Sequence, residues 1–314
     1  MHQRAGHVSD REEMSKEQRS AYDEKRWVAL TSVMAAVLLT GTKLVVGVIS
    51  GSLGILSEAA HSGLDLLAAI MTYMSVRISG KKPDHGHTYG HGKIENLSAL
   101  FQTLLLLITC GWIIFEAGNR LLGSKQVHVD AGIWSFLVII LSICVDIGRS
   151  RALSRAAKKH NSQALEADAL HFTTDIWSSC VVMLGLICVW FSDRTGIQWL
   201  EKADSIAALG VAVIVLGVCF QLGRRSVDAL LDSAPADLQE KITSSILANH
   251  DVADIERVRV RTSGPDLFAD IIVTVARDLD ICRSHQIADE IEMQLQTSFP
   301  NIDILVHVEP EKVD

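Results

Sequence analysis

The chain has 314 residues, of which 48% are hydrophobic and 5% aromatic, and its formal net charge at pH 7 is −8. Counted by segment, residues 1–26, 27–225 and 226–314 carry net charges of 0, +3 and −11. This pattern excludes a disordered chain, a disulfide-stapled secreted domain and a nucleic-acid-binding protein. It indicates a membrane-embedded middle region followed by a soluble, acidic tail.

Residues 1–26 alternate charges and predict a polar cytoplasmic extension that is mobile or partly helical, with no cleavable signal peptide. Six apolar stretches then fill residues 27–225, each long enough for the roughly 20 residues that a membrane-spanning helix requires. They are Trp27–Ser50, Leu53–Val76, Ile94–Leu122, Val129–Gly148, Ala164–Phe191 and Ser205–Gly223. The sequence therefore predicts a six-helix transmembrane domain. A large soluble helical protein, the alternative, would need polar stripes at helical spacing, which these stretches lack.

The loops between these stretches predict the orientation, because cytoplasmic loops carry an excess of Lys and Arg. Basic residues concentrate in one alternate set, at Lys25, Arg26, Arg77, Lys81, Lys82, Lys93, Arg149, Arg151, Arg155, Lys158, Lys159, Arg224 and Arg225. The opposite set has only Arg120, Lys125, Arg194 and Lys202. We therefore expect an integral multi-pass protein with both termini in the cytoplasm.

Residues 226–314 predict a small α+β domain. Helical spacing of apolar residues predicts helices, alternation predicts strands, and the Ser-Gly-Pro-Asp run at 263–266 predicts a turn. The expected order is helix 237–249, strand 255–262, strand 267–276, helix 283–299 and strand 302–308. This αββαβ order suits helices packed on one face of an antiparallel sheet.

Two of the apolar stretches contain a His and an Asp four residues apart: His61 with Asp65, and His171 with Asp175. At this spacing both side chains share one face of a helix. Ionisable residues inside a bilayer indicate a functional site, because burying them without a partner is unfavourable. Two such faces together offer two imidazoles and two carboxylates, a set that suits tetrahedral Zn²⁺. The alternative is a His–Asp hydrogen bond within each helix.

Four other ionisable residues lie in or near the apolar stretches. Asp168 is one turn before His171 and could accept a hydrogen bond from an imidazole, lie on a proton path or interact with a helix end. Lys43, Glu58 and Asp146 lie nearer the ends, where extension of the side chain to the membrane surface or packing against another helix is expected.

Further His residues lie outside the apolar stretches. The loop at 84–91 contains one Asp, three His and two Gly, and could grip a metal ion or be a solvated polar loop. In the tail, His285 begins a helix, and His307 and Glu309 point the same way along a strand. A surface His is the alternative explanation for each tail residue.

Longer motifs make the sequence recognisable over roughly residues 27–310. They are the Ser50-Gly51-Ser52 run with Leu56 before His61-x-x-x-Asp65, the run 89–95 (YGHGKIE), Ala167-Asp168-x-x-His171-x-x-x-Asp175, Leu230-Leu231-Asp232, and Arg259-x-Arg261-x-Ser263-Gly264-Pro265. On these motifs the chain resembles the cation diffusion facilitator family. The resemblance implies a homodimeric antiporter that exchanges cytoplasmic Zn²⁺ or a similar ion for protons. It also implies six membrane helices and a ferredoxin-like cytoplasmic domain for metal sensing and dimerisation.

The resemblance also assigns site residues. It implies a transport site at His61, Asp65, His171 and Asp175, and a cytoplasmic loop site at Asp84, His87 and His91. It implies a site in the tail at His285, His307 and Glu309. Two further His positions of some bacterial members are Glu256 and Ile272 here, and Ile272 cannot ligate a metal. An ion pair between the two domains would join Lys93 to Asp232.

The combined interpretation is a transporter without enzymatic activity. Its partners would be divalent metal ions, protons, the lipid bilayer and a second copy of the chain, and its location the bacterial cytoplasmic (inner) membrane. Zn²⁺ is the leading substrate, and Cd²⁺, Co²⁺, Ni²⁺, Fe²⁺ and Mn²⁺ stay open because affinity order alone does not set selectivity. An uncoupled channel and a transport-inactive metal sensor or scaffold are the alternatives. A membrane metalloprotease is disfavoured because no HExxH motif is present.

Overall fold

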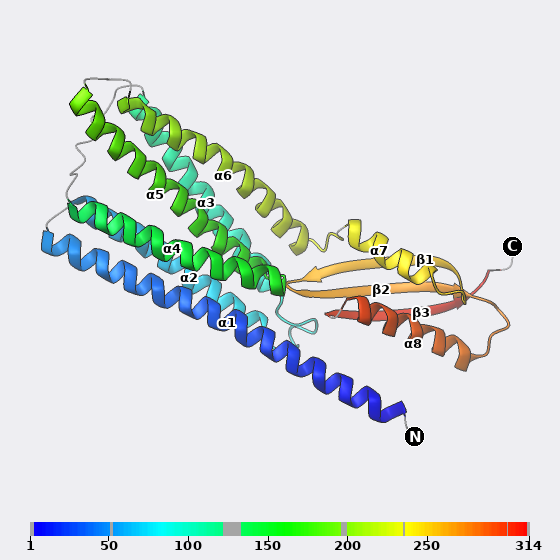
Figure 1. Cartoon of the computed structure of the whole chain (residues 1–314). Helices are drawn as coiled ribbons and strands as arrows, with labels where there is room; N and C mark the ends of the chain where they lie inside the picture. Colours follow the sequence, from blue (N-terminus) through cyan, green and yellow to red (C-terminus); the bar gives the residue numbers. More distant parts are fainter. Residues whose placement is uncertain are drawn as a thin grey trace.

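The computed structural model describes residues 3–50, 53–121, 133–195, 200–234, 236–299 and 301–312. Six long helices form a bundle (Figure 1): α1 (Gln3–Ser50), α2 (Leu53–Ser79), α3 (Lys93–Leu121), α4 (Ile133–His160), α5 (Gln163–Thr195) and α6 (Leu200–Leu230). A smaller domain follows, made of α7 (Ala236–Leu247), β1 (Val252–Ser263), β2 (Asp266–Val275), α8 (Ile281–Ser298) and β3 (Ile302–Pro310). It lies beyond one end of the bundle.

Each predicted apolar stretch lies largely within one of these six helices. Helix α1 runs on from the polar segment without a break at residue 26, so the predicted extension forms the first turns of the same helix. Three of the described helices are long and apolar enough to cross a membrane, over Arg19–Ile49, Lys93–Asn119 and Leu209–Leu230. Helices α2, α4 and α5 have comparable lengths, of 27, 28 and 33 residues.

The surface of the bundle differs from that of a water-soluble protein. Large apolar side chains point outward along the helices, including Leu38, Ile49, Ile108, Trp112 and Phe220. Many of the buried positions between helices are instead small residues, such as Ala29, Ala36, Ala68, Ala99 and Ala212. Small residues let membrane helices approach closely, and extended apolar surface requires an apolar surrounding. The bundle therefore has the character of a membrane domain.

The small domain has the predicted αββαβ order and a sheet in the order β1-β2-β3. The expectation of an antiparallel sheet was wrong in part, because β1 and β2 are antiparallel but β2 and β3 are parallel. The reason is α8: a helix that connects two neighbouring strands returns the chain to its starting edge, so both strands run the same way. Both helices pack on the same face of the sheet, where they contribute Ile242, Ile246, Ile287, Ile291 and Leu295 to one apolar core.

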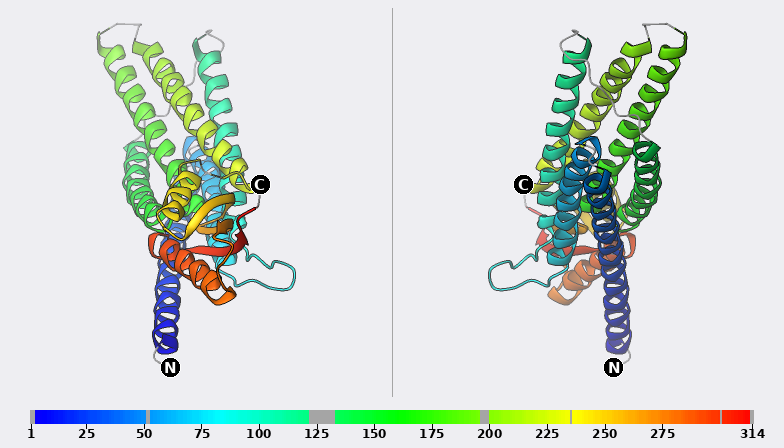
Figure 2. Two further views of the ribbon diagram at one scale, coloured as in Figure 1. Left: turned by 90° about the vertical axis from the view of Figure 1, so that its right-hand side faces the viewer. Right: turned by 90° about the vertical axis from the view of Figure 1, so that its left-hand side faces the viewer.

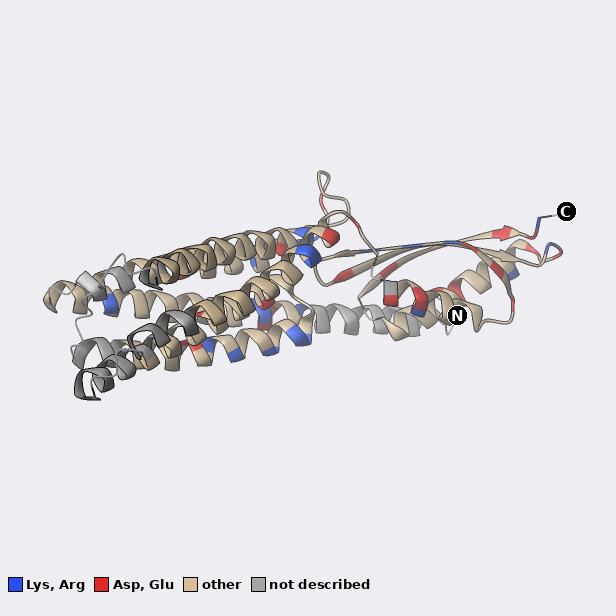
Figure 3. Cartoon of the chain, turned by 90° about the horizontal axis from the view of Figure 1, so that it is seen from above, with Lys and Arg blue, Asp and Glu red and all other residues tan. Residues whose placement is uncertain are grey.

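The turn between β1 and β2 contacts the start of α3. Gly264 adopts a positive φ of 59°, and its N–H donates to the side-chain oxygen of Asn96 at 3.0 Å. A Cβ atom on Gly92 would lie 2.2 Å from the carbonyl oxygen of Ser263, so only glycine allows this approach. Figure 3 shows Lys and Arg at the end of the bundle that adjoins the small domain.

The predicted ion pair between the two domains is confirmed. Lys93 Nζ lies 2.8 Å from Asp232 Oδ1, and Lys93 also donates to the carbonyl oxygen of Leu230 at 3.3 Å. Arg261, on β1, lies 3.8 Å from the same carboxylate oxygen of Asp232. One carboxylate therefore joins the start of α3, the end of α6 and the sheet.

Candidate functional site

Helices α2 and α5 bring three of the four predicted transport-site residues together. His171 Nε2 on α5 lies 3.1 Å from Asp65 Oδ1 on α2 and 3.7 Å from Asp175 Oδ2 on its own helix. One ligand atom from each residue lies within 4.8 Å of the others. The Asp65–His171 contact crosses between helices, so these residues do more than form the His–Asp hydrogen bond within one helix that the sequence left open.

The fourth predicted ligand, His61, lies at the edge of this group. Its Nε2 is 4.0 Å from Asp175 Oδ1, and its side chain is 41% exposed, whereas that of His171 is 8% exposed. The difference has a simple geometric cause. His61 is one turn before Asp65 on α2, and His171 lies between the carboxylates of Asp65 and Asp175. The structure therefore presents a compact group of three candidate ligands from the predicted transport site, which we call the transport-site triad (Asp65, His171 and Asp175), with His61 beside it.

The triad has the ligand types needed to bind a divalent cation. Two carboxylates supply two negative charges, and an imidazole supplies a nitrogen ligand of intermediate softness. Such a set matches the N and O ligands that Zn²⁺ and related divalent ions accept. Because metal ligands must be deprotonated, a bound cation and bound protons exclude each other at these atoms. The arrangement is thus able to exchange one for the other without any covalent step.

A buried polar network on α4 lies beside α1 and α5, and the sequence did not predict it. Arg149 donates to the hydroxyl of Ser32 at 3.2 and 3.1 Å, and contacts Asp146 at 3.5 Å. Its guanidinium also lies 3.5 Å from the centre of the Phe172 ring, in cation–π contact. Arg149 was assigned to a cytoplasmic loop, and the only signal in the sequence was a basic residue three positions after Asp146.

Lys43 and Asp146 are both buried, so neither side chain extends to the membrane surface. Lys43 donates to the hydroxyl of Ser62 at 2.8 Å and is 4% exposed, so it packs against α2 rather than extending to the membrane surface. Asp146 is 7% exposed and packs with Arg149. The side chain of Glu58 lies outside the described residues.

Asp168 is fully buried on α5, one turn before His171. Among the described residues, neither of its carboxylate oxygens accepts a hydrogen bond in good geometry. It lies in the second turn of α5, beyond the first turn, in which an interaction with that helix end is strongest. Its roles as an acceptor for an imidazole and as a proton-path residue stay predictions.

The loop between α2 and α3 gathers its three predicted ligands, and Figure 2 shows this loop projecting from the bundle. Asp84 Oδ1 lies 3.2 Å from His87 Nδ1, and Asp84 Oδ2 lies 3.4 Å from His91 Nε2. Backbone N–H groups of His87 and Gly86 also donate to Asp84, and these bonds lower the pKa of its carboxyl group. Asp84 is thus kept ionised, as a metal ligand must be.

The three predicted tail ligands are not gathered in the described residues of one chain. His285 lies on α8, which packs on the core face of the sheet, and its ring is 3.9 Å from Asp289. His307 and Glu309, 3.5 Å apart, alternate with the core residues of β3 and therefore lie on the opposite face. The neighbour of His307 on β2 is Ile272, which cannot ligate. A shared metal site would need a second chain.

This placement gives a prediction for the tail. We expect Zn²⁺ to raise the melting temperature of the fragment 234–314, which has its own apolar core, by drawing two copies together. Differential scanning fluorimetry at several fragment concentrations would measure this, and the shift should grow with concentration. His285→Ala should remove the shift and His250→Ala, also an exposed tail His, should keep it. A melting temperature unchanged at saturating Zn²⁺ would show that the domain does not sense this metal.

Two protein-family models match this chain. The family model of the cation efflux transmembrane domain matches residues 29–231, and the family model of the cation efflux protein cytoplasmic domain matches residues 234–311. The chain belongs to the cation efflux family. As a family member it is a transmembrane protein of the ion-transport class, as the sequence predicted.

Relatives of this cation efflux protein align over most of its length. A protein named cation-efflux pump FieF from Shewanella oneidensis is 30% identical, with 95% of this chain and 98% of that one covered. The FieF protein of Yersinia enterocolitica is also 30% identical, with 91% of this chain and 92% of that one covered. A solved structure of CzrB is 26% identical and covers 25% of this chain and 99% of that one, with a TM-score of 0.25.

Proposed function

We propose that this cation efflux protein exports a divalent metal ion, with Zn²⁺ as the leading substrate, in exchange for protons. The observation that supports this most directly is the transport-site triad. Its three ligand atoms lie within 4.8 Å of one another between two helices of an apolar bundle. We propose His61 as the fourth ligand, since its ring is already 4.0 Å from Asp175. The loop site (Asp84, His87, His91) is proposed as a second metal site.

Charge balance supports the exchange mechanism. With a dication bound, the two carboxylates of Asp65 and Asp175 make the site formally neutral. When the ion leaves, protons taken up by the imidazoles and carboxylates replace its charge, so the buried site avoids an uncompensated net charge in both states. A more acidic exterior would favour release of the metal, and the cytoplasm would favour reloading. Movement of helices around a site near the middle of the membrane would alternate its access.

The proposed organisation follows the sequence predictions. Residues 27–225 would form six membrane-spanning helices, with residues 1–26 before them and residues 226–314 as a ferredoxin-like domain after them. Both termini would lie in the cytoplasm of a bacterial cell, in its inner membrane. Two copies would form a homodimer, in which the acidic tails repel each other until metal ions bind between them.

The metal preference follows from the donor set. Two imidazole nitrogens with two carboxylate oxygens suit Zn²⁺ and leave Cd²⁺, Co²⁺ and Ni²⁺ as close competitors. Fe²⁺ and Mn²⁺ also stay open as substrates, because affinity order alone does not set selectivity. An uncoupled channel would use the same ligands, so proton coupling is the property that must be measured.

The proposal predicts proton flux coupled to metal flux. Full-length protein would be reconstituted in liposomes that contain a Zn²⁺ indicator and a pH indicator. Zn²⁺ added outside should enter the vesicles while the lumen becomes more alkaline, because protons leave in exchange. Protein-free liposomes and an ionophore that collapses the pH gradient are the controls. Entry of Zn²⁺ without a pH change would establish an uncoupled channel, and absence of entry would favour a sensor or scaffold.

A further inference from the structure

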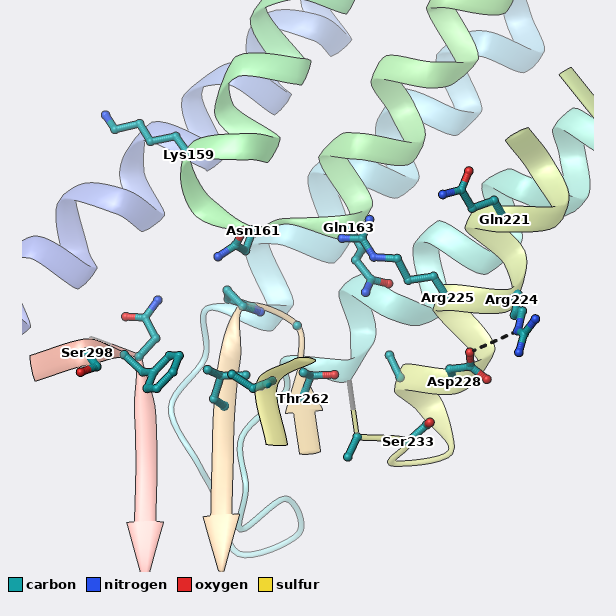
Figure 4. A pocket seen from close by; sticks show the side chains of 18 of the residues that line it. Lys159, Asn161, Gln163, Gln221, Arg224, Arg225, Asp228, Ser233, Thr262 and Ser298 are labelled. Atoms are coloured by element: carbon teal, nitrogen blue, oxygen red, sulfur yellow. Dashed lines mark ion pairs between the residues drawn. The ribbon is translucent and has the colours of Figure 1, made fainter. Parts of the chain in front are cut away.

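A pocket of about 1140 Å³ lies where the helix bundle meets the small domain. Its wall comes from the end of α4, the start of α5 and the last turns of α6, together with the β1–β2 turn and the segment between α8 and β3. Figure 4 shows polar side chains from these elements around the pocket, among them Lys159, Asn161, Gln221, Arg225 and Thr262. None of them belongs to the three candidate metal sites.

Three cationic side chains line this junction pocket (Lys159, Arg224 and Arg225), and the only acidic lining residue in the described part of the chain is Asp228. Arg224 Nε lies 3.8 Å from Asp228 Oδ2, which is longer than a hydrogen bond, and the side chain of Arg224 is 75% exposed. The pocket wall therefore has a net positive charge.

Two of the cations also contact carboxylates outside the lining. Lys159 lies 2.6 Å from Glu24, and Arg225 lies 3.0 Å from Glu166. All four side chains are substantially exposed, so these ion pairs add little to the stability of the fold. They can therefore rearrange with only a small loss of stability. A guanidinium has five N–H donors, and its contact with one carboxylate leaves donors for a second anion.

The other groups around the pocket also suit a phosphate. Helix α5 begins at Gln163 and α7 at Ala236, and residues at both starts line the pocket, so two positive helix ends adjoin it. Hydroxyl groups of Thr262 and Ser298 add neutral donors. On the α6 side, the aromatic ring of Phe220 is 74% exposed and lines the same pocket. Donors for an anion thus stand next to apolar surface.

We propose that the junction pocket binds the phosphate group of an anionic phospholipid. With the proposed topology, Arg224 and Arg225 lie at the cytoplasmic end of α6, at the depth of the lipid headgroups. Basic pockets between membrane helices on this side hold anionic headgroups. Free phosphate carries the same anionic group, but it has no apolar part that could contact Phe220. A lipid held here would link α4, α5 and α6 to the small domain.

The test uses the full-length protein in a neutral detergent. The probes are dihexanoyl phosphatidylglycerol, dihexanoyl phosphatidylcholine and inorganic phosphate, each titrated while binding and the thermal unfolding temperature are measured. The pocket variant is Arg224→Gln with Arg225→Gln. Its matched control is Arg151→Gln with Arg155→Gln, which removes the same charge from exposed α4 positions outside the pocket. If the pocket variant fails to fold, Lys159→Gln replaces it, with the adjacent exposed Lys158→Gln as control.

We expect phosphatidylglycerol to bind and stabilise the wild-type protein, and phosphatidylcholine to have little effect. The pocket variant should weaken binding of phosphatidylglycerol about tenfold or more, since charge-assisted hydrogen bonds are lost, while the control variant changes it less than about twofold. Equal weakening in both variants would show diffuse surface attraction and overturn the proposal. Absence of lipid binding would overturn it as well. Phosphate binding as tight as that of the lipid would reassign the pocket to a free anion and overturn the lipid assignment.

Discussion

Replacement of Asp175 by Ala should abolish Zn²⁺ exchange. With Zn²⁺ bound, Asp65 and Asp175 neutralise the dication, and removal of either carboxylate leaves a net positive charge in a largely buried site. The penalty for an uncompensated buried charge is about 3–5 kcal/mol, which corresponds to a loss of affinity of more than about a hundredfold. Asp175 Oδ2 also lies 3.7 Å from His171 Nε2 and its Oδ1 lies 4.0 Å from His61 Nε2, so its removal withdraws a carboxylate that lies near both imidazoles.

The measurement is Zn²⁺ uptake into proteoliposomes at matched protein density, with Asp175→Asn as a second variant that keeps the shape of the side chain. Asp278→Ala, which removes an exposed carboxylate of the tail, should transport like the wild type. The unfolding temperature of each variant, measured without metal, separates loss of the site from loss of the fold. Wild-type exchange by a folded Asp175→Ala protein would show that the triad is not the transport site.

Local spacing explains why part of the site could be predicted from the sequence. A His and an Asp four residues apart share a helix face whatever the tertiary structure, so each pair could be read directly from the sequence. The contact between Asp65 and His171 could not be predicted in this way. It depends on how α2 packs on α5, and the two residues lie 106 positions apart in the sequence. The position of His61 at the edge of the triad depends on the same packing.

The fold shows the same division between local and long-range information. The predicted order of elements in the tail followed from apolar periodicity, but the direction of β3 depends on which edge of the sheet it joins. Arg149 and Lys43 were interpreted as residues of loops or helix ends, because hydropathy gives no indication of the partner that a charged side chain meets. Their partners, Ser32 and Ser62, lie on other helices, and serine carries almost no signal in such a pattern.

Loss of a buried ion pair at the end of the bundle should strongly reduce the stability of the protein. Glu95, at the start of α3, is fully buried and lies 2.9 Å from Lys25 of α1. Ser79 of α2 donates to the same carboxylate at 2.8 Å, and Ser162, just before α5, donates to its other oxygen. One carboxylate therefore joins α1, α2, α3 and the start of α5.

We expect Glu95→Ala to lower the free energy of unfolding by about 3–5 kcal/mol, because Lys25 is left as a buried charge without its counter-ion. The double variant Lys25→Met with Glu95→Leu removes both charges and fills the space with apolar groups, so it should recover much of the loss. Thermal and denaturant unfolding of the purified protein in detergent would compare the variants.

The matched control for this pair is Glu24→Ala, which breaks the contact of Glu24 with Lys159 and its contact with the ring of His160. The contact with Lys159 is shorter, at 2.6 Å, but both side chains are exposed, and exposed pairs contribute little to stability. If burial decides the effect, Glu95→Ala should be far more destabilising than Glu24→Ala despite the longer distance. Equal shifts in the two variants, or a double variant no more stable than Glu95→Ala alone, would show that the buried charge of Lys25 is not the cause.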